Sequence, residues 1–384
     1  MVPAVSEHRP ILLVTNDLGP RAGGIETFIL GLLGELKGSE IVIYTSTQLG
    51  DSKFDQELAQ KYGVKVIRDK SKILLPTPRV TRAVKEVMAS HNSKVIWFGA
   101  AAPLAFMAPS LRLAGAEKIV AITHGHEVWW SKVFPFNLAM RRIGNGVDVL
   151  TYLGSFTREA MKSAVGSKVK LIQIAPGISI DHFVPGPKPI DLVNQYQLTR
   201  RPTIISVGRL VHRKGQDKLI QALPKIISKI PNVVLVLIGT GPYLAHLKGL
   251  VKKLGLEQNV IFLGRLTYDQ LPVHLLLGDL FIMPSRSRFF GLEVEGLGIV
   301  YLEASACGLP VIAGDSGGAP DAVKVGETGY VVDGRSPQAI ADIAIKVLSD
   351  PELAKQLGEN GRNWAQENWS WKLWGRKFAE LLAL

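Results

Sequence analysis

Two glutamates lie eight positions apart in the segment Glu295-Gly-Leu-Gly-Ile-Val-Tyr-Leu-Glu303. A helix turns by about 100° per residue, so a helix beginning at Glu295 would hold both carboxylates on roughly one side. Carboxylates accept hydrogen bonds from sugar hydroxyls, and backbone N–H groups at a glycine-rich helix start face negative charge. The segment therefore suits a polyhydroxylated ligand that carries a diphosphate. One capping glutamate and one solvated helical glutamate would give the same pattern.

The loop after the first predicted strand ends in Gly23-Gly24, directly before a predicted helix. Glycine there would let a phosphate approach the backbone closely, and a turn that requires positive φ would explain the two glycines equally well. The loop has neither the G-x-G-x-x-G pattern of dinucleotide binding nor the Gly-Lys-Ser/Thr of a Walker A loop. Neither of those nucleotide-binding classes is indicated.

Two later loops carry imidazole or basic side chains after predicted strands. Thr123-His-Gly-His-Glu127 lacks the helical His-x-x-x-His spacing and the distant ligands of a zinc site. We expect His124 to form hydrogen bonds in a cleft, with a purely structural histidine as the alternative. Arg209 and Lys214 lie five positions apart across a turn. They could converge on one diphosphate, or they are ordinary solvated charges.

Short apolar strands alternate with helical stretches along the chain, which predicts parallel sheets covered on both faces. The pattern breaks at Pro185-Gly-Pro-Lys-Pro-Ile190, which can form neither a helix nor an inner strand and is interpreted as a linker. We therefore predict an α/β fold of two doubly wound, Rossmann-like domains, residues 1–185 and 190–365, with a cleft between them. Ligands of such sheets bind at the carboxyl ends of the strands.

Composition restricts the class of protein further. The chain has 384 residues, of which 47% are hydrophobic and 20% charged, so a globular protein of two domains is expected. The single cysteine, Cys307, excludes a disulfide within the chain and suggests the cytosol. No secretory signal is expected. The uncharged run Val95–Leu111 contains Gly99, Pro103 and Pro109, so it predicts a strand, a turn and a helix rather than a membrane span.

The net charge is +12, and the first 180 residues hold 22 Lys/Arg against 14 Asp/Glu. Such a balance favours acidic partners. No nucleic-acid-binding module is recognised, so nucleic acid is not expected as a partner, and a membrane surface is the better hypothesis. Ordinary solvated basic faces are the alternative.

Together these segments resemble the retaining glycosyltransferases of the two-Rossmann-domain type (GT-B, family 4). The resemblance rests on Gly23-Gly24, His124, Gly208-Arg209 with Lys214-Gly215, Gly264-Arg265, and Glu295 to Glu303 followed by Gly314–Pro320. Within that family, Thr123–Trp130 and Gly291–Glu303 are most similar to actinobacterial mannosyltransferases that act on phosphatidylinositol mannosides. Leu297 stands where many relatives carry Phe.

The resemblance implies a donor, an acceptor and a place for each. The donor would be GDP-mannose, the acceptor a phosphatidylinositol mannoside, and the linkage α-1,6. The residues 1–185 would bind the acceptor, 190–365 would bind the nucleotide-sugar, and a C-terminal helix over about 366–384 would cross back onto the first domain. The enzyme would lie in the cytoplasm, peripherally on the inner face of the plasma membrane.

The resemblance also assigns roles to residues. Arg209 and Lys214 would hold the donor diphosphate, with backbone contacts from Gly24. Glu303 would accept from the ribose hydroxyls, and Arg265 would lie by the nucleobase. The donor sugar would be contacted by Glu295, by His124 and by the backbone of Gly296, Leu297 and Gly298. Asp17 or Arg21 would meet the acceptor.

No cofactor and no metal are expected, because Arg and Lys would stand where a divalent cation is otherwise needed. Retention usually requires a carboxylate nucleophile, and none is clearly placed, so front-side attack within an ion pair is the mechanistic hypothesis. Three alternatives stay open. They are a family member with another donor or acceptor, a nucleotide-sugar epimerase, and a non-catalytic protein that binds nucleotide-sugar or lipid.

Overall fold

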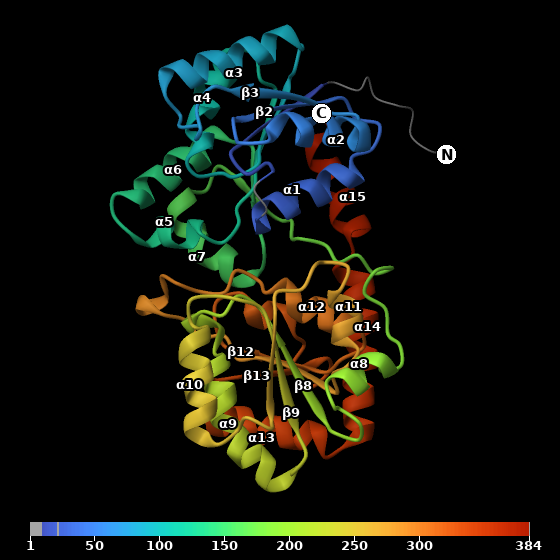
Figure 1. The fold of residues 1–384 in the computed structure, drawn as a ribbon. Helices are drawn as coiled ribbons and strands as arrows, with labels where there is room; N and C mark the ends of the chain where they lie inside the picture. Colours follow the sequence, from blue (N-terminus) through green and yellow to red (C-terminus); the bar gives the residue numbers. More distant parts are fainter. Residues whose placement is uncertain (1–9, 21–22, 384) are drawn as a thin grey trace. The chain divides into compact units, whose positions relative to one another are not determined.

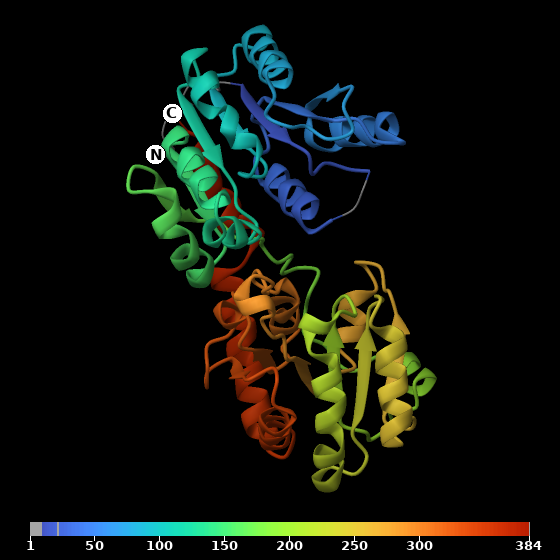
Figure 2. The same ribbon diagram turned by 90° about the vertical axis from the view of Figure 1, so that its left-hand side faces the viewer.

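The structure is a computed structural model that describes residues 10–20 and 23–383, apart from the side chain of Phe290. The chain divides into two compact units (Figures 1 and 2). The first runs up to Gly177 and takes in the segment from Trp371 onwards, and the second runs from Ile178 to Ser370. Arg21 lies outside the described residues.

The described part of the first unit contains a seven-stranded parallel sheet in the order β3-β2-β1-β4-β5-β6-β7. Its strands are β1 (Ile11–Thr15), β2 (Ile41–Ser46), β3 (Lys65–Asp69), β4 (Val95–Phe98), β5 (Lys118–Ala121), β6 (Val149–Tyr152) and β7 (Lys170–Gln173). Its helices are α1 (Gly24–Glu35), α2 (Asp51–Tyr62), α3 (Pro78–Ser90), the 3-10 helix η1 (Leu104–Met107), α4 (Ala108–Leu113), α5 (Glu127–Lys132), α6 (Phe136–Gly146), α7 (Ser155–Val165) and α15 (Trp371–Leu382).

The second unit contains a six-stranded parallel sheet in the order β10-β9-β8-β11-β12-β13. Its strands are β8 (Thr203–Val207), β9 (Val234–Ile238), β10 (Val260–Gly264), β11 (Leu280–Met283), β12 (Val311–Gly314) and β13 (Gly329–Val332). Its helices are α8 (Ile190–Gln195), η2 (His212–Lys214), α9 (Gln216–Lys229), α10 (Leu244–Leu254), α11 (Leu271–Leu275), η3 (Phe289–Gly291), α12 (Ile299–Ala306), η4 (Ala319–Ala322), α13 (Pro337–Leu348) and α14 (Pro351–Asn368).

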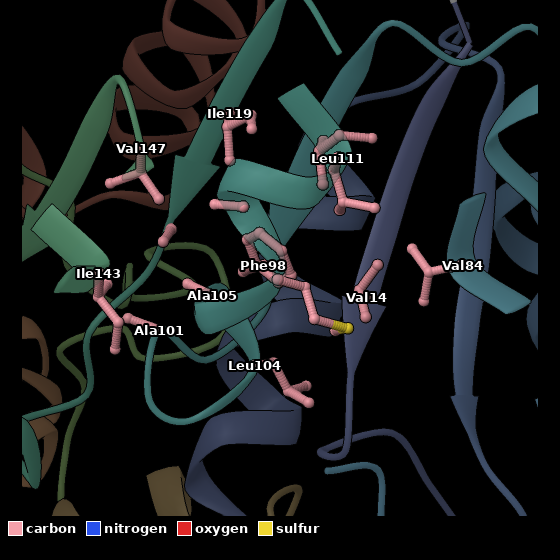
Figure 3. Packing of buried hydrophobic residues seen from close by; sticks show 14 of the residues in the cluster. Val14, Val84, Phe98, Ala101, Leu104, Ala105, Leu111, Ile119, Ile143 and Val147 are labelled. Atoms are coloured by element: carbon pink, nitrogen blue, oxygen red, sulfur yellow. The ribbon is translucent and has the colours of Figure 1, made fainter. Parts of the chain in front are cut away.

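Both sheets place their apolar strands between layers of helices, and the prediction of two doubly wound α/β domains is confirmed. In the first unit, every residue of β1 is buried. The core contains Val14 and Phe98 of the sheet, which pack with Leu104, Leu111 and other apolar side chains from helices (Figure 3). In the second unit, α9 packs against α10 and α13, while α12 packs against α14. None of the helices in the described part of the chain is both long and apolar enough to cross a lipid bilayer.

The chain leaves the first unit at Gly177 and returns at Trp371. A Cβ atom on Gly177 would lie 2.5 Å from the backbone nitrogen of Trp371. The segments that contain Gly177 and Trp371 are therefore in close contact, and a side chain larger than that of glycine would clash there. The segment after Gly177 belongs to the second unit because Arg362 of α14 donates hydrogen bonds to the carbonyl oxygens of Ile180 and Phe183. The chain therefore passes between the two units after Gly177 and before Trp371, whereas the sequence analysis expected the limits at residues 185 and 366.

The C-terminal helix α15 packs against α1 within the first unit, as Figures 1 and 2 show for the red helix. Phe378 is fully buried with its ring centroid 4.9 Å from that of Trp97 on β4. Trp371 packs on Phe28, and a Cβ atom on Gly31 would lie only 2.2 Å from the Trp371 ring. The last helix thus completes a core built by residues far earlier in the chain.

Phe378→Ala should lower the free energy of unfolding of the first unit by about 3–5 kcal/mol, since it leaves a cavity against Trp97. Urea denaturation followed by circular dichroism measures the change. The control is Leu49→Ala, at a side chain that is 99% exposed, which should have almost no effect. Equal effects of the two substitutions would contradict the packing role of α15.

Candidate active site

Gly23 and Gly24 begin α1, in the loop that follows β1. Gly23 is extended (φ −164°, ψ 164°), Gly24 is not among the residues with positive φ, and a Cβ atom on either would meet nothing within 4 Å. The alternative of a turn that requires positive φ is therefore wrong. Neither a positive φ nor close packing requires glycine here. Gly23 serves as the N-cap of α1, a position at which glycine is favoured.

His124 lies in the loop after β5. Its two hydrogen-bond partners, Gly99 and Glu127, both belong to the first unit. Its Nε2 atom is 2.6 Å from the carbonyl oxygen of Gly99, and its backbone N–H donates to Glu127 at 2.9 Å. A carbonyl only accepts, so Nε2 carries the hydrogen. Burial lowers the pKa of His124, so the ring is neutral and Nδ1 is an acceptor. The charge of Asp17 also acts on this imidazole, which places Asp17 near it.

Glu127 is fully buried at the start of α5. One oxygen accepts from the His124 backbone, and the other lies 3.3 Å from Nε2 of His126. The Glu127 carboxylate therefore fixes the His124 loop. Among the described residues, no three His, Cys, Asp or Glu side chains gather in the manner of a metal site.

The second unit contains a buried ion cluster. Nζ of Lys214 lies 2.7 Å from Oε2 of Glu295, and Arg213 donates to the same oxygen at 2.8 Å. Lys214 and Glu295 are only 8% and 7% exposed. Burial alone would raise the pKa of Glu295, but Lys214 and Arg213 outweigh it and hold the pKa below its ordinary value. Arg213 also lies 3.8 Å from Glu293, which pairs with Arg288 at 3.1 Å. Three cations thus face two carboxylates, and the cluster keeps a net positive charge.

Glu295 is fixed from the backbone as well. Its N–H donates to Oγ of Ser316 at 3.1 Å, and its carbonyl accepts from the N–H of Gly318 at 2.8 Å. A Cβ atom on Gly318 would lie 2.0 Å from the carbonyl oxygen of Gly296, so the predicted glycine turn at 314–320 packs directly on this segment.

The prediction that a helix begins at Glu295 is wrong. Helix α12 begins at Ile299, after Gly298 in the left-handed conformation (φ 78°). Glu295 lies in the preceding loop, and Glu303 is the fifth residue of the helix. The left-handed φ of Gly298, two residues after Gly296, stops helix propagation at this point. Leu297 between them is 4% exposed and packs inward.

Glu303 is a buried carboxyl group without a protein partner. It is 7% exposed, and within residues 10–20 and 23–383 no hydrogen bond or ion pair to its side chain is formed. Burial raises its pKa from 4.5 to about 7. Burying an unpaired carboxyl is costly, so the group is suited to accept hydrogen bonds from a ligand.

Arg209 and Arg265 follow the carboxyl ends of β8 and β10, and both side chains are exposed. Neither forms an ion pair with a described residue. Both guanidinium groups can therefore meet a ligand without first breaking an ion pair. The convergence of Arg209 and Lys214 on a diphosphate stays a prediction, and in this structure Lys214 is paired with Glu295.

Arg286 and Asp217 form a buried ion pair beside the cluster that the sequence prediction missed. The guanidinium of Arg286 donates to Asp217 at 3.0 Å, and its backbone N–H donates to the carbonyl of Arg213 at 2.8 Å. Both side chains are at most 5% exposed. This pair holds the two ends of the segment from Arg213 to Asp217, so it positions Lys214. Arg213 itself was also missed, although it is adjacent to Lys214 in the sequence.

The fold agrees with the comparisons with known proteins. Residues 192–364 match the family model "Glycosyl transferases group 1". The structure resembles Anabaena HepE in complex with UDP (TM-score 0.81, 21% identity, covering 97% of this chain and 99% of that one). It also resembles sucrose-phosphate synthase from Thermosynechococcus elongatus (TM-score 0.77, 23% identity, covering 97% and 98%). These likenesses show the GT-B fold.

Several relatives match this chain over nearly its full length. Together with the family model they show that the chain belongs to the group 1 glycosyltransferases. It is 44% identical to the GDP-mannose-dependent alpha-(1-6)-phosphatidylinositol monomannoside mannosyltransferase of Mycolicibacterium smegmatis, over 97% of this chain and 98% of that protein. The protein of the same name from Mycobacterium tuberculosis H37Rv is also 44% identical, over 97% of both chains. A Corynebacterium glutamicum enzyme named for the monoacylated form of that acceptor is 40% identical, over 98% and 99%.

Asp217→Asn should lower the free energy of unfolding of the second unit by about 3–5 kcal/mol, because Arg286 would stay buried without a counter-charge. The control is Asp342→Asn, which breaks the more exposed pair of Asp342 with Lys225 and should cost less than about 1 kcal/mol. Urea denaturation of both variants makes the comparison. A cost for Asp217→Asn as small as that of the control would show that the buried pair does not hold the segment.

Glu303→Gln should stabilise the protein at pH 8 and have little effect near pH 4.5. The unfolded carboxyl ionises above pH 4.5 and the folded one above about pH 7, so the folded state loses stability as pH rises through this window. Gln does not ionise and escapes a loss of up to about 3 kcal/mol. Thermal unfolding of both proteins across this range is the measurement, and a difference independent of pH would contradict it.

Proposed function

We propose that this chain is a retaining α-mannosyltransferase that moves mannose from GDP-mannose to a phosphatidylinositol mannoside, forming an α-1,6 linkage. The observation that carries the proposal is the 40–44% identity, over almost the full length, to enzymes named for that donor and acceptor. The buried cations and carboxyl groups of the second unit supply the chemistry that such a donor needs.

The positive ion cluster is proposed to bind the donor diphosphate. Lys214, Arg213 and Arg288 together exceed the charge of Glu295 and Glu293 by one. The exposed guanidinium of Arg209 follows β8, as Lys214 does. Fixed cations in a site of low exposure stabilise the negative charge that develops as GDP leaves. Backbone N–H groups of Gly24 in the first unit are proposed to contact the same phosphates.

Glu295 is proposed to contact the mannose. Both cations bind its Oε2 atom, and no described residue bonds Oε1, so Oε1 can accept from a sugar hydroxyl. The backbone of Gly296 to Gly298 is proposed to assist. In the first unit, Nδ1 of His124 is the matching acceptor, since its other nitrogen is committed to Gly99.

Glu303 and Arg265 are proposed to bind the nucleoside. The unpartnered carboxyl of Glu303 suits the two neighbouring hydroxyls of a ribose, and Arg265 is exposed after β10 to meet the base. Asp17 is proposed to meet the acceptor, together with Arg21. Because no carboxylate is assigned as nucleophile, we propose front-side attack of the acceptor hydroxyl within an ion pair, and a trapped mannosyl-enzyme adduct would contradict it.

A lipid acceptor requires contact with a membrane, so we propose that the enzyme acts peripherally at the inner face of the plasma membrane. The net charge of +12 supports attraction to anionic lipid.

Lys214→Ala and Glu295→Gln should each reduce mannose transfer by about 100-fold or more, because each removes charge stabilisation that acts on the leaving diphosphate or its sugar. The measurement is transfer of radiolabelled mannose from GDP-mannose to a lipid extract. The matched control is Lys218→Ala in α9, whose ammonium bonds Gln221 and not Glu295. Its activity should stay near that of the wild type.

The same assay separates the alternative functions. An altered sugar nucleotide formed without lipid would indicate an epimerase, and GDP-mannose binding without transfer in the wild type would indicate a binding protein. A thermal-shift screen of GDP-, UDP- and ADP-sugars tests the donor, and stabilisation by UDP- or ADP-sugars alone would overturn the choice of GDP-mannose.

A further inference from the structure

One face of the first unit gathers exposed apolar side chains beside basic ones. It is built by α4, α6 and the amino ends of β5 and β7, and we name it the α4–α6 face (Figure 1). Two hollows on it adjoin, since Pro109 and Asn145 line both. Leu113 on this face is 90% exposed and Leu138 is 56% exposed. Single exposed leucines are ordinary, but their grouping beside two hollows marks a contact surface.

Helix α6 divides its residues between core and surface. Met140 and Ile143 are buried in the core of the first unit. Leu138, Arg141 and Arg142 instead line the first of the two hollows. Phe134, 75% exposed, directly precedes the helix. The outer side of α6 therefore combines large apolar groups with two guanidinium groups on long apolar stems, a pattern suited to the boundary between water and hydrocarbon.

The positive charge of this face is not neutralised by the protein. Lys118, Lys168 and Lys170 line the second hollow, and neither these lysines nor Arg141 and Arg142 form an ion pair with any described residue. The two acidic residues that line this hollow form ion pairs with other basic residues. Asp148 pairs with Arg112 at 2.6 Å, and Glu117 pairs with Lys94 at 3.6 Å.

We propose that the α4–α6 face docks the protein on an anionic lipid bilayer. Basic groups attract the headgroups, while Leu113 and Leu138 enter the outermost hydrocarbon. A nucleic acid would satisfy the charges but would leave the exposed leucines without an apolar partner. This inference deepens the proposed function, because it gives the lipid acceptor's membrane a defined contact on the first unit.

The test uses the full chain and vesicles of phosphatidylcholine mixed in equal amounts with phosphatidylinositol, in a sedimentation assay. Arg141→Glu combined with Arg142→Glu should weaken binding by at least about tenfold. The matched control reverses Lys252 and Lys253, an adjacent exposed pair on α10 of the second unit, and should change binding less than about twofold. Wild-type binding should also fall steeply as salt rises.

The apolar part is tested separately. Leu138→Asp should weaken vesicle binding, whereas Leu49→Asp, at an exposed leucine outside the face, should not. Thermal unfolding of each variant checks that the first unit remains folded. The proposal is overturned if the control pair weakens binding as much as the Arg141 and Arg142 pair, if wild type binds pure phosphatidylcholine equally well, or if RNA competes for the face while Leu138→Asp has no effect.

Transfer to a short-chain, water-soluble acceptor separates this proposal from the proposed function. The doubly reversed Arg141 and Arg142 variant should keep that activity while it loses vesicle binding. Intact vesicle binding with no transfer in the wild type would overturn the proposed function alone, and transfer without vesicle binding in the wild type would overturn the docking face alone.

Discussion

The ion cluster of Glu295 with Lys214 and Arg213 is the interaction on which the site of the second unit depends. It joins the loop after β8 to the segment before α12, across 82 positions of sequence. Burying charges is costly unless they are paired and hydrogen-bonded. Here Arg286 donates hydrogen bonds to Asp217 and to the carbonyl of Arg213, which fixes the segment that carries Arg213 and Lys214. In the proposed function, these fixed charges would act on the diphosphate of the donor.

This constraint also explains the glycines around the cluster. The loop before α12 must lie close to the turn at 314–320, and Gly318 allows its backbone to reach the carbonyl of Gly296. Gly298 then takes a left-handed conformation and sets where α12 begins. The backbone path is thus determined by close contact between two loops rather than by the propensity of the α12 sequence, and it leaves Glu295 facing the cations.

The sequence predicted the alternation of strands and helices well, because near-continuous apolar strands have few other structural solutions. The choice of Glu295, Glu303, Lys214 and His124 as site residues stays a prediction, made from residue types and spacings that are visible locally. The start of α12 was wrong, because the contact that displaces it comes from a turn distant in sequence. Arg286 was missed for the same reason: its partner Asp217 is 69 positions away, and no local pattern joins them.

Glu303 shows how burial can couple ligand binding to protons. Near pH 7 its carboxyl is about half protonated, since burial raises its pKa to about 7. Ribose hydroxyls that donate to it favour the ionised form, so a nucleoside that binds there must release part of a proton. Each pH unit below 7 then costs the ligand about 1.4 kcal/mol of binding free energy. Under the role proposed for Glu303, a group that is unfavourable for folding at neutral pH would favour a ligand with paired hydroxyl donors.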